Sequence, residues 1–307
     1  MKKETLYKFF LVACAFFIAF TALIPLPTVE AASDQKWINQ VWNKYKTYNK
    51  KTVSDYKTYQ QQIDKNYKQL YDTSQAALDV LESKVLADQE QWNEKLKDDL
   101  DEMERLFGDN RDMANKLRDY KNFISPTYLN SPMWKYTKEA SRTYLNSKMW
   151  KLDKELSETY LNSYMWKYNK TISPTYLNSA AWKMKNNVSE TYLNSYMWKL
   201  RNASSDTYLN SPMWKYRSGK ISKTQAQKQY DALYKQQTTA LANNNAARKK
   251  EIANMANSTK TNVNQLILET SQALESQREE TLQRISEARK KLTGEGLTWE
   301  PLLLVSP

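Results

Sequence analysis

The chain has 307 residues, with 46 Lys or Arg, 34 Asp or Glu and a net charge of +12. It contains no histidine and a single cysteine, Cys14, which excludes disulfide frameworks and Cys/His metal sites and removes the commonest general base of enzymes. With only four glycines, the composition favours long solvent-exposed helices, and we expect a non-enzymatic protein without catalytic residues, metal or cofactor.

Residues 1–31 have the pattern of a secretory signal peptide. Lys2, Lys3 and Lys8 precede an apolar run over 9–24, and two prolines end that run. Small residues at Val29 and Ala31 predict cleavage after Ala31. We therefore expect a secreted protein that is extracellular or associated with the cell wall or envelope. Lipid anchoring at Cys14 is the lesser alternative, because most of the apolar run follows this cysteine.

Residues 35–107 are predicted to form an N-terminal helical arm. The segment contains no glycine and no proline, and apolar, aromatic or small residues recur from Tyr45 to Leu106 at a mean step of about 3.6 residues. This step is the period of an amphipathic α-helix, and it is looser than the 3.5 of a strict heptad. Gly108 offers a C-cap for the helix.

Residues 125–220 contain six tandem repeats with a constant sixteen-residue period and the pattern TYLNS-x-MWK nearly unchanged in each. The block carries 15 Lys or Arg against six Asp or Glu, or +9, so it holds most of the net positive charge. One tyrosine, one tryptophan and one following lysine mark each repeat. These residues are Tyr128, Trp134, Lys135, Tyr144, Trp150, Lys151, Tyr160, Trp166, Lys167, Tyr176, Trp182, Lys183, Tyr192, Trp198, Lys199, Tyr208, Trp214 and Lys215.

A continuous helix does not fit this repeat. Sixteen residues at about 100° each would place successive tryptophans on nearly opposite faces, and four prolines interrupt the block. Two structures remain: short strands, or pairs of short helices in which both serines of each repeat, such as Ser125 and Ser131, act as N-caps. We prefer helix pairs stacked as a small solenoid, because the Asn-Ser corner lacks the glycine that tight hairpin turns usually need.

Residues 221–293 form a second predicted arm of nearly the same length, and 294–307 an apolar tail. Neither arm can bury its apolar stripe alone, so we predict that the two arms pair as an antiparallel coiled coil or bundle with the repeats at its tip. Pairing within one molecule and self-association of two remain open. The predicted fold class is mainly α.

The repeat aromatics are either packing residues or exposed platforms beside lysines. In the second case they would bind an anionic wall polymer or a surface protein, with six weak sites acting together. We expect this envelope-binding function. The alternatives are a secreted, toxin-like helical effector that contacts membranes through its amphipathic helices and apolar tail, and a structural spacer. Nucleic acid is a less favoured partner, because a secreted chain seldom meets it.

Overall fold

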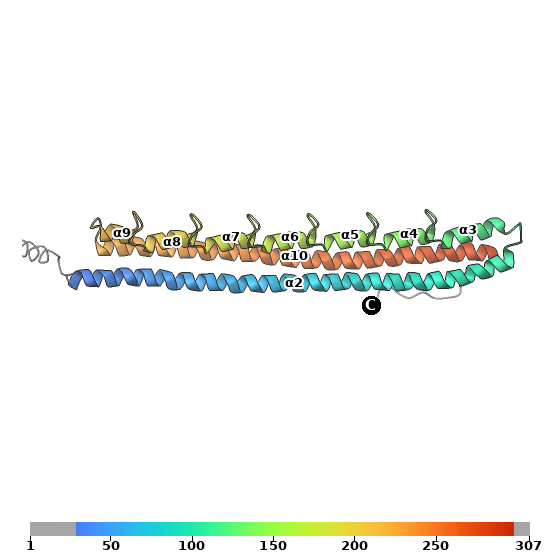
Figure 1. The fold of residues 1–307 in the computed structure, drawn as a ribbon, viewed down its shortest axis with the longest axis horizontal. Coiled ribbons are helices and arrows are strands. Elements are labelled where there is room, and N and C mark those ends of the chain that lie inside the picture. The colour runs from blue at the N-terminus through green and yellow to red at the C-terminus, as the bar shows by residue number, and fades with distance from the viewer. Residues whose placement is uncertain (1–28, 298–307) are drawn as a thin grey trace, which may run out of the picture. The chain divides into compact units, whose positions relative to one another are not determined.

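The computed structural model describes residues 29–297, with side chains from Asp34 onward. Two long helices, α2 (Val29–Phe107) and α10 (Lys223–Thr293), flank a series of short ones, and the described residues contain no strand (Figure 1). The mainly α class is thus confirmed. The short helices are α3 (Ala114–Ile124), α4 (Pro132–Glu139), α5 (Lys148–Glu155), α6 (Tyr164–Ile172), α7 (Ala180–Asn187), α8 (Tyr196–Ser204) and α9 (Pro212–Arg217).

The described residues form two compact units. The first unit combines 29–57 with 185–244, and the second combines 58–184 with 245–297. Each unit therefore contains part of both arms together with part of the repeat block. The apolar run of the predicted signal, Cys14 and the tail from Thr298 lie outside the described residues. Within 29–297, no helix combines the length and the apolar character that a bilayer-spanning segment needs.

Both long helices bury side chains with an eleven-residue period. Eleven residues make three turns at 3.67 residues per turn, which keeps one face of a nearly straight helix turned to the same neighbour. In α10 the buried series is Tyr230, Leu241, Ile252, Val263, Leu274 and Ile285, each at most 2% exposed. In α2 one such series includes Val41, Ile63, Ser74, Val85 and Leu96.

The two arms run parallel, so the predicted antiparallel pairing is wrong. In the first unit, Trp37 Nε1 donates to Gln227 (2.7 Å), and in the second, Arg278 pairs with Asp88 (2.9 Å). In the first unit, the Trp37–Gln227 and Asp34–Lys223 contacts join residues 190 and 189 positions apart. In the second unit, Asp88–Arg278 and Asp99–Arg289 both join residues 190 positions apart. A nearly constant difference of this kind identifies parallel helices, since antiparallel helices would keep a constant sum. Figure 1 shows the same direction in each unit, with α10 beside α2.

The repeat block lies beside the arms in both units, so it is not a separate head at their tip. In the first unit, Met197 and Leu200 of α8 share a core with Tyr45 of α2 and Leu241 of α10. In the second unit, the Tyr136 hydroxyl of α4 donates to Asp88 of α2 at 3.0 Å. The block runs antiparallel to both arms and thereby provides the return path that two parallel arms require.

Each repeat contains one helix, not the predicted pair. The second serine is the N-cap in all six repeats, as predicted: its Oγ accepts the N–H of the following tryptophan at 2.9 Å. The first serine begins a turn instead. The helix buries positions i, i+3 and i+7, as in Met149, Leu152 and Leu156. This face packs on the arms, so the repeats do not stack on one another as a solenoid.

The repeat period and the arm period are coupled. From Tyr120 to Tyr136 the repeat block advances by one full repeat, whereas their partners Asp99 and Asp88 are separated by one eleven-residue arm period. Eleven helical residues rise about 16.5 Å. A sixteen-residue repeat must fit this length, so about five residues are surplus and loop outwards. Tyr120 also shows that α3 occupies the place of a further repeat helix, without the aromatic loop, at the start of the block.

Candidate functional site: the repeat loops

The surplus residues of each repeat form a short turn with a fixed geometry. In the third repeat, the N–H of Ser163 donates to the carbonyl of Tyr160 (3.1 Å), which closes a four-residue turn. Asn162 occupies the third position with φ of 67°, and all six repeat asparagines have φ between 62° and 67°. Asparagine tolerates this left-handed conformation better than other residues with a Cβ.

The two repeat serines hold the turn from both sides. The Oγ of Ser157 accepts the N–H groups of Thr159 (3.2 Å) and Tyr160 (3.1 Å). The Oγ of Ser163 donates to the carbonyl of Ser157 (2.6 Å) while it caps the helix. The bond between the two serines recurs in all six repeats. Both serine hydroxyls and the N–H groups of Thr159, Tyr160 and Ser163 are therefore satisfied within the loop itself.

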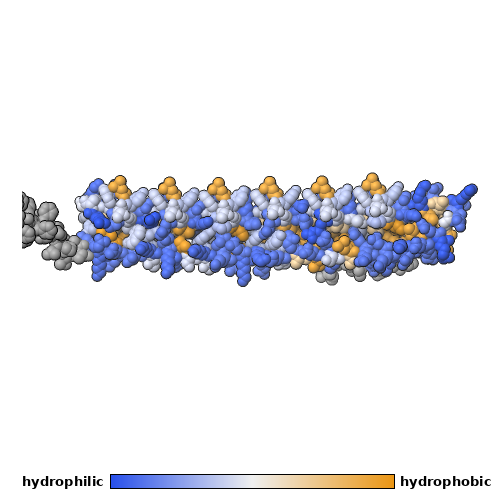
Figure 2. Space-filling view, in the orientation of Figure 1, coloured by the Kyte–Doolittle hydropathy of each residue, from blue (hydrophilic) through white to orange (hydrophobic). Residues whose placement is uncertain are grey.

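A leucine stands at the corner of every turn and is exposed to solvent. These six side chains, which we call the tip leucines, are 62–65% exposed, and the tyrosine before each is 42–53% exposed. The tip leucines are Leu129, Leu145, Leu161 and Leu177 in the second unit, and Leu193 and Leu209 in the first. Figure 2 shows apolar tips at regular intervals along the edge of each unit that carries the repeat helices.

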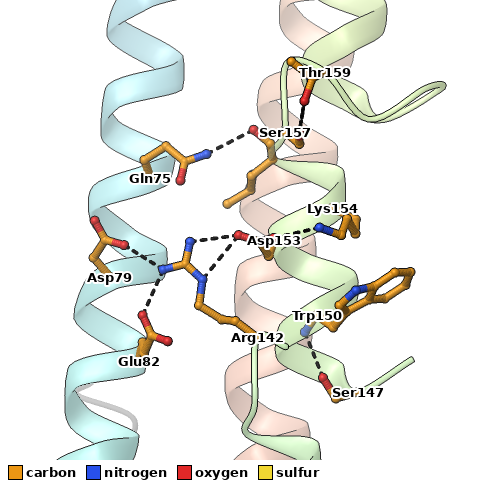
Figure 3. Close-up of polar contacts among 11 residues, drawn as sticks. Gln75, Asp79, Glu82, Arg142, Ser147, Trp150, Asp153, Lys154, Ser157 and Thr159 are labelled. Atoms are coloured by element: carbon orange, nitrogen blue, oxygen red, sulfur yellow. Dashed lines mark hydrogen bonds and ion pairs between the residues drawn. The ribbon is translucent and has the colours of Figure 1, made fainter. Parts of the chain in front are cut away.

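The repeat tryptophans are neither core residues nor open platforms. Each is half-buried, because the neighbouring methionine or alanine takes the inward position, as Met149 does beside Trp150. Figure 3 shows Trp150 and Lys154 on the side of α5 that faces away from α2, whereas Arg142 reaches towards α2. The ring of Trp150 meets Tyr160 of the next loop edge to face, with centroids 6.2 Å apart.

A lysine fills the space beside this aromatic pair in the first three repeats. The Nζ atom of Lys170 lies 4.7 Å from the centroid of Trp166 and 4.4 Å from that of Tyr176. Lys138 and Lys154 take the same place in their repeats. These cation–π contacts leave less free ring face for a stacked sugar. The lysine that directly follows each tryptophan, named from the sequence, is exposed or half-exposed and does not occupy this place.

The acidic side chains of the repeat block make contacts inside the chain. Glu158 lies near Tyr67, and burial, followed by this carboxylate, raises the pKa of Tyr67. Five others accept hydrogen bonds or form ion pairs. Their partners are Lys148 for Glu139, Arg142 for Asp153, Tyr164 for Glu155, Tyr45 for Glu190, and Arg217 for Asp206. The outward charge of the block therefore comes mainly from its lysines.

Arg142 fixes one loop to the arm. Its guanidinium contacts Asp79 (3.1 Å) and Glu82 (2.9 Å) of α2 and Asp153 (2.8 Å) of α5 (Figure 3). At the other end of α5, Gln75 of α2 donates to the carbonyl of Leu156 (3.1 Å), which satisfies a carbonyl at the helix end. These contacts hold the loop before α5 and the C-terminal end of α5 against α2.

Sequence reasoning identified the repeat tyrosines, tryptophans and lysines but missed the tip leucines. The available signal was that this leucine recurs in every repeat without belonging to the i, i+3, i+7 face of the helix. Within residues 29–297 no three His, Cys, Asp or Glu side chains lie together as metal ligands. No protein-family model, curated protein or solved structure matches the chain.

Proposed function

We propose that this chain is a secreted, non-enzymatic protein of the cell envelope that adheres to an anionic surface through its repeat loops. One observation carries the proposal: every repeat presents the same fixed turn with an exposed tyrosine and leucine, while the acids beside it are engaged within the chain. Each repeat then supplies one copy of the same weak site, and the copies act together on an extended ligand.

The arms serve as the support in this proposal. Their eleven-residue period favours a nearly straight pair of helices that form a parallel coiled coil. Each repeat helix then packs on an equivalent position of this pair. The signal-like segment with cleavage after Ala31 directs the chain to the outside, where wall polymers and lipid headgroups supply anionic surfaces. A pure spacer is less well supported, because a leucine that is 62–65% exposed adds almost nothing to the stability of the fold.

The experiment is a sedimentation assay with the chain from Ala32 onward, which omits the apolar run of the signal. We expect it to bind at least one of two anionic surfaces, purified cell walls or phosphatidylglycerol vesicles, at low salt. Binding should weaken between about 0.05 and 0.5 M salt, because exposed lysines are screened. A protein that binds neither surface at low salt would contradict the proposal.

A further inference from the structure

We infer that the surface contacted by the loops is a lipid bilayer, and that the tip leucines insert into its interfacial region. This inference rests on the proposed function and names its partner. The four tip leucines of the second unit, Leu129, Leu145, Leu161 and Leu177, are the best test, because one compact unit holds them all.

The side chains of the loops combine the apolar, aromatic and cationic groups that favour successive levels of a membrane surface. The leucine is the most exposed apolar group at the corner of the turn, and the tyrosine beside it presents an apolar ring with a polar hydroxyl. In the loops of Tyr144, Tyr160 and Tyr176, the tryptophan and a lysine of the preceding helix lie next to the tyrosine. Tyrosine and tryptophan favour the headgroup level, apolar side chains favour the acyl boundary below it, and lysine is attracted to anionic headgroups.

The same loops are poorly suited to bind a polysaccharide. Recognition of sugars needs polar groups that are available to hydroxyls and ring faces that are open for stacking. Here the serine hydroxyls and turn amides bond to one another. Trp134, Trp150 and Trp166 each face the next tyrosine and a lysine. A leucine at the outermost position gains nothing from contact with a hydrated polymer, but it gains from transfer into lipid.

The uniformity of the loops also favours a bilayer. A protein partner presents different side chains at different places, so an interface with it selects different residues at each contact. All six turns carry Tyr-Leu-Asn-Ser, and within the second unit one repeat corresponds to one eleven-residue arm period, or about 16.5 Å. Identical contacts at a regular spacing suit a surface that is chemically the same everywhere. A bilayer of anionic lipid has that property and also complements the basic repeat block.

The test compares two variants of the chain from Ala32 onward on vesicles. The tip variant carries Leu129→Ser, Leu145→Ser, Leu161→Ser and Leu177→Ser. Its matched control removes four exposed apolar side chains from the arms of the same unit, through Val80→Ser, Leu86→Ser, Leu106→Ser and Leu268→Ser. Both variants keep the apolar tail. Circular dichroism should give both the helix content of the parent chain, because all eight side chains are exposed.

We expect the tip variant to lose at least ~100-fold in partition to vesicles of phosphatidylglycerol and phosphatidylcholine, since each buried leucine is worth roughly 10-fold. The control should stay within about 3-fold of the parent chain. Equal binding by the tip variant and the parent, or an equal loss in both variants, would overturn the inference.

A depth measurement tests insertion directly. The chain from Ala32 onward contains no cysteine, so Leu161→Cys and Leu86→Cys can each carry a single environment-sensitive fluorophore. On vesicles, the label at 161 should shift to the blue and be quenched by lipids brominated in the acyl chain, whereas the label at 86 should not. Quenching of both labels to the same degree would count against insertion by the loops.

The outcomes separate this inference from the function beneath it. Binding to purified walls but not to vesicles would overturn the bilayer as partner and leave the envelope-binding function standing. Binding to neither surface would remove both. Binding to vesicles that survives in the tip variant would show that membrane contact is made elsewhere, and the inference would then be wrong.

Discussion

At the scale of single residues, the repeat asparagine decides whether a loop can form. Its left-handed conformation strains any other residue that has a Cβ, by about 1–2 kcal/mol, whereas glycine adopts it without strain. This explains why Tyr-Leu-Asn-Ser recurs in every copy although no loop contains glycine. It also explains why the first serine cannot cap a second helix: the turn closes within six residues of it.

We therefore predict opposite effects of two substitutions at Asn162. Asn162→Ala should cost about 1 kcal/mol of local stability, so the turn amide of Ser163 should exchange with solvent roughly 5-fold faster. Asn162→Gly should leave that exchange within about 2-fold of the parent chain. The measurement is hydrogen exchange of the Ser163 N–H, with the amide of Leu152 inside the preceding helix as an internal reference. Faster exchange in the glycine variant than in the alanine variant would refute the assignment of strain.

At the scale of elements, a buried ion pair fixes the register of the two arms in the second unit. Arg278 of α10 is 2% exposed and forms two hydrogen bonds with Asp88 of α2, both of 2.9 Å. Tyr136 of the repeat block donates to the same carboxylate. One arm period further along, Asp99 and Arg289 form the same kind of pair with Tyr120, but they are more exposed. Both pairs disfavour a shift of α10 along α2.

Removing one partner of the buried pair should be strongly destabilising. We predict that Arg278→Leu lowers the free energy of unfolding by about 3–5 kcal/mol, because Asp88 then keeps an unpaired buried charge. Arg289→Leu should cost clearly less, since water reaches that pair. The combination of Arg278→Leu with Asp88→Leu and Tyr136→Phe should recover part of the loss, because it removes the unpaired charge and the hydroxyl that donates to it. Urea unfolding followed by circular dichroism measures all three variants, and equal losses for the two arginine variants would contradict this account.

The sequence predicted the helical arms and the N-cap at the second serine of each repeat, because each depends on local patterns, whereas the predicted cap at the first serine is a turn. The direction of the arms could not be predicted in this way, since an apolar stripe looks alike in both directions. It follows only once the repeat block is identified as the third partner. The eleven-residue period was also missed, because a mean step near 3.6 does not separate about 3.6 from about 3.67 residues per turn when the stripe is mixed with tyrosine and serine.

For a similar reason, the sequence predicted the aromatic residues and lysines of the candidate site but not the tip leucines. Periodicity selects the tyrosine, tryptophan and lysine of each repeat equally well, but it does not say which face each occupies. The inward positions belong to the methionine and to the residues three and seven places after it, as in Met165, Tyr168 and Ile172. This assignment leaves the leucine outside. Only the three-dimensional turn shows that it is the most exposed apolar group of the repeat.

At the scale of the whole molecule, buried tyrosines make the fold sensitive to high pH. Burial raises the pKa of Tyr230 to about 12, although a hydrogen bond with Ser204 opposes the shift. Burial, together with a nearby carboxylate, also raises the pKa of Tyr45, Tyr120 and Tyr136. Because the folded pKa exceeds the unfolded one, these groups contribute stability that is fully present below about pH 10.

We predict that the melting temperature falls as the pH rises from about 10 to about 12. In that range the unfolded chain releases tyrosine protons that the folded chain retains, so unfolding becomes more favourable. Tyr230→Phe should make the decline shallower, because phenylalanine has no proton to release. Thermal unfolding at a series of pH values measures both. Tyr230→Phe leaves every lysine in place, so identical slopes would rule out the contribution of Tyr230.

The coupling of the sixteen-residue repeat period to the eleven-residue arm period gives the strongest prediction for the architecture. Deleting residues 141–156 alone removes one repeat from the second unit but leaves one surplus period in each arm, so buried layers beyond the deletion lose their partners. Deleting 71–81 and 261–271 as well removes the matching arm segments, at the constant offset of 190. Because one arm period completes three helical turns, the remaining faces stay aligned.

We expect the triple deletion to unfold cooperatively at a temperature near that of the parent chain, and the repeat deletion alone to melt at least ~10 °C lower. A third variant removes 71–81 and 261–271 but keeps the repeat. Its melting temperature should fall by a similar amount, because the repeat helix then has no arm segments to pack against. If the single deletion were as stable as the triple one, the repeats would be independent of the arms. The regular spacing of the tip leucines would then have no basis in the packing of the helices.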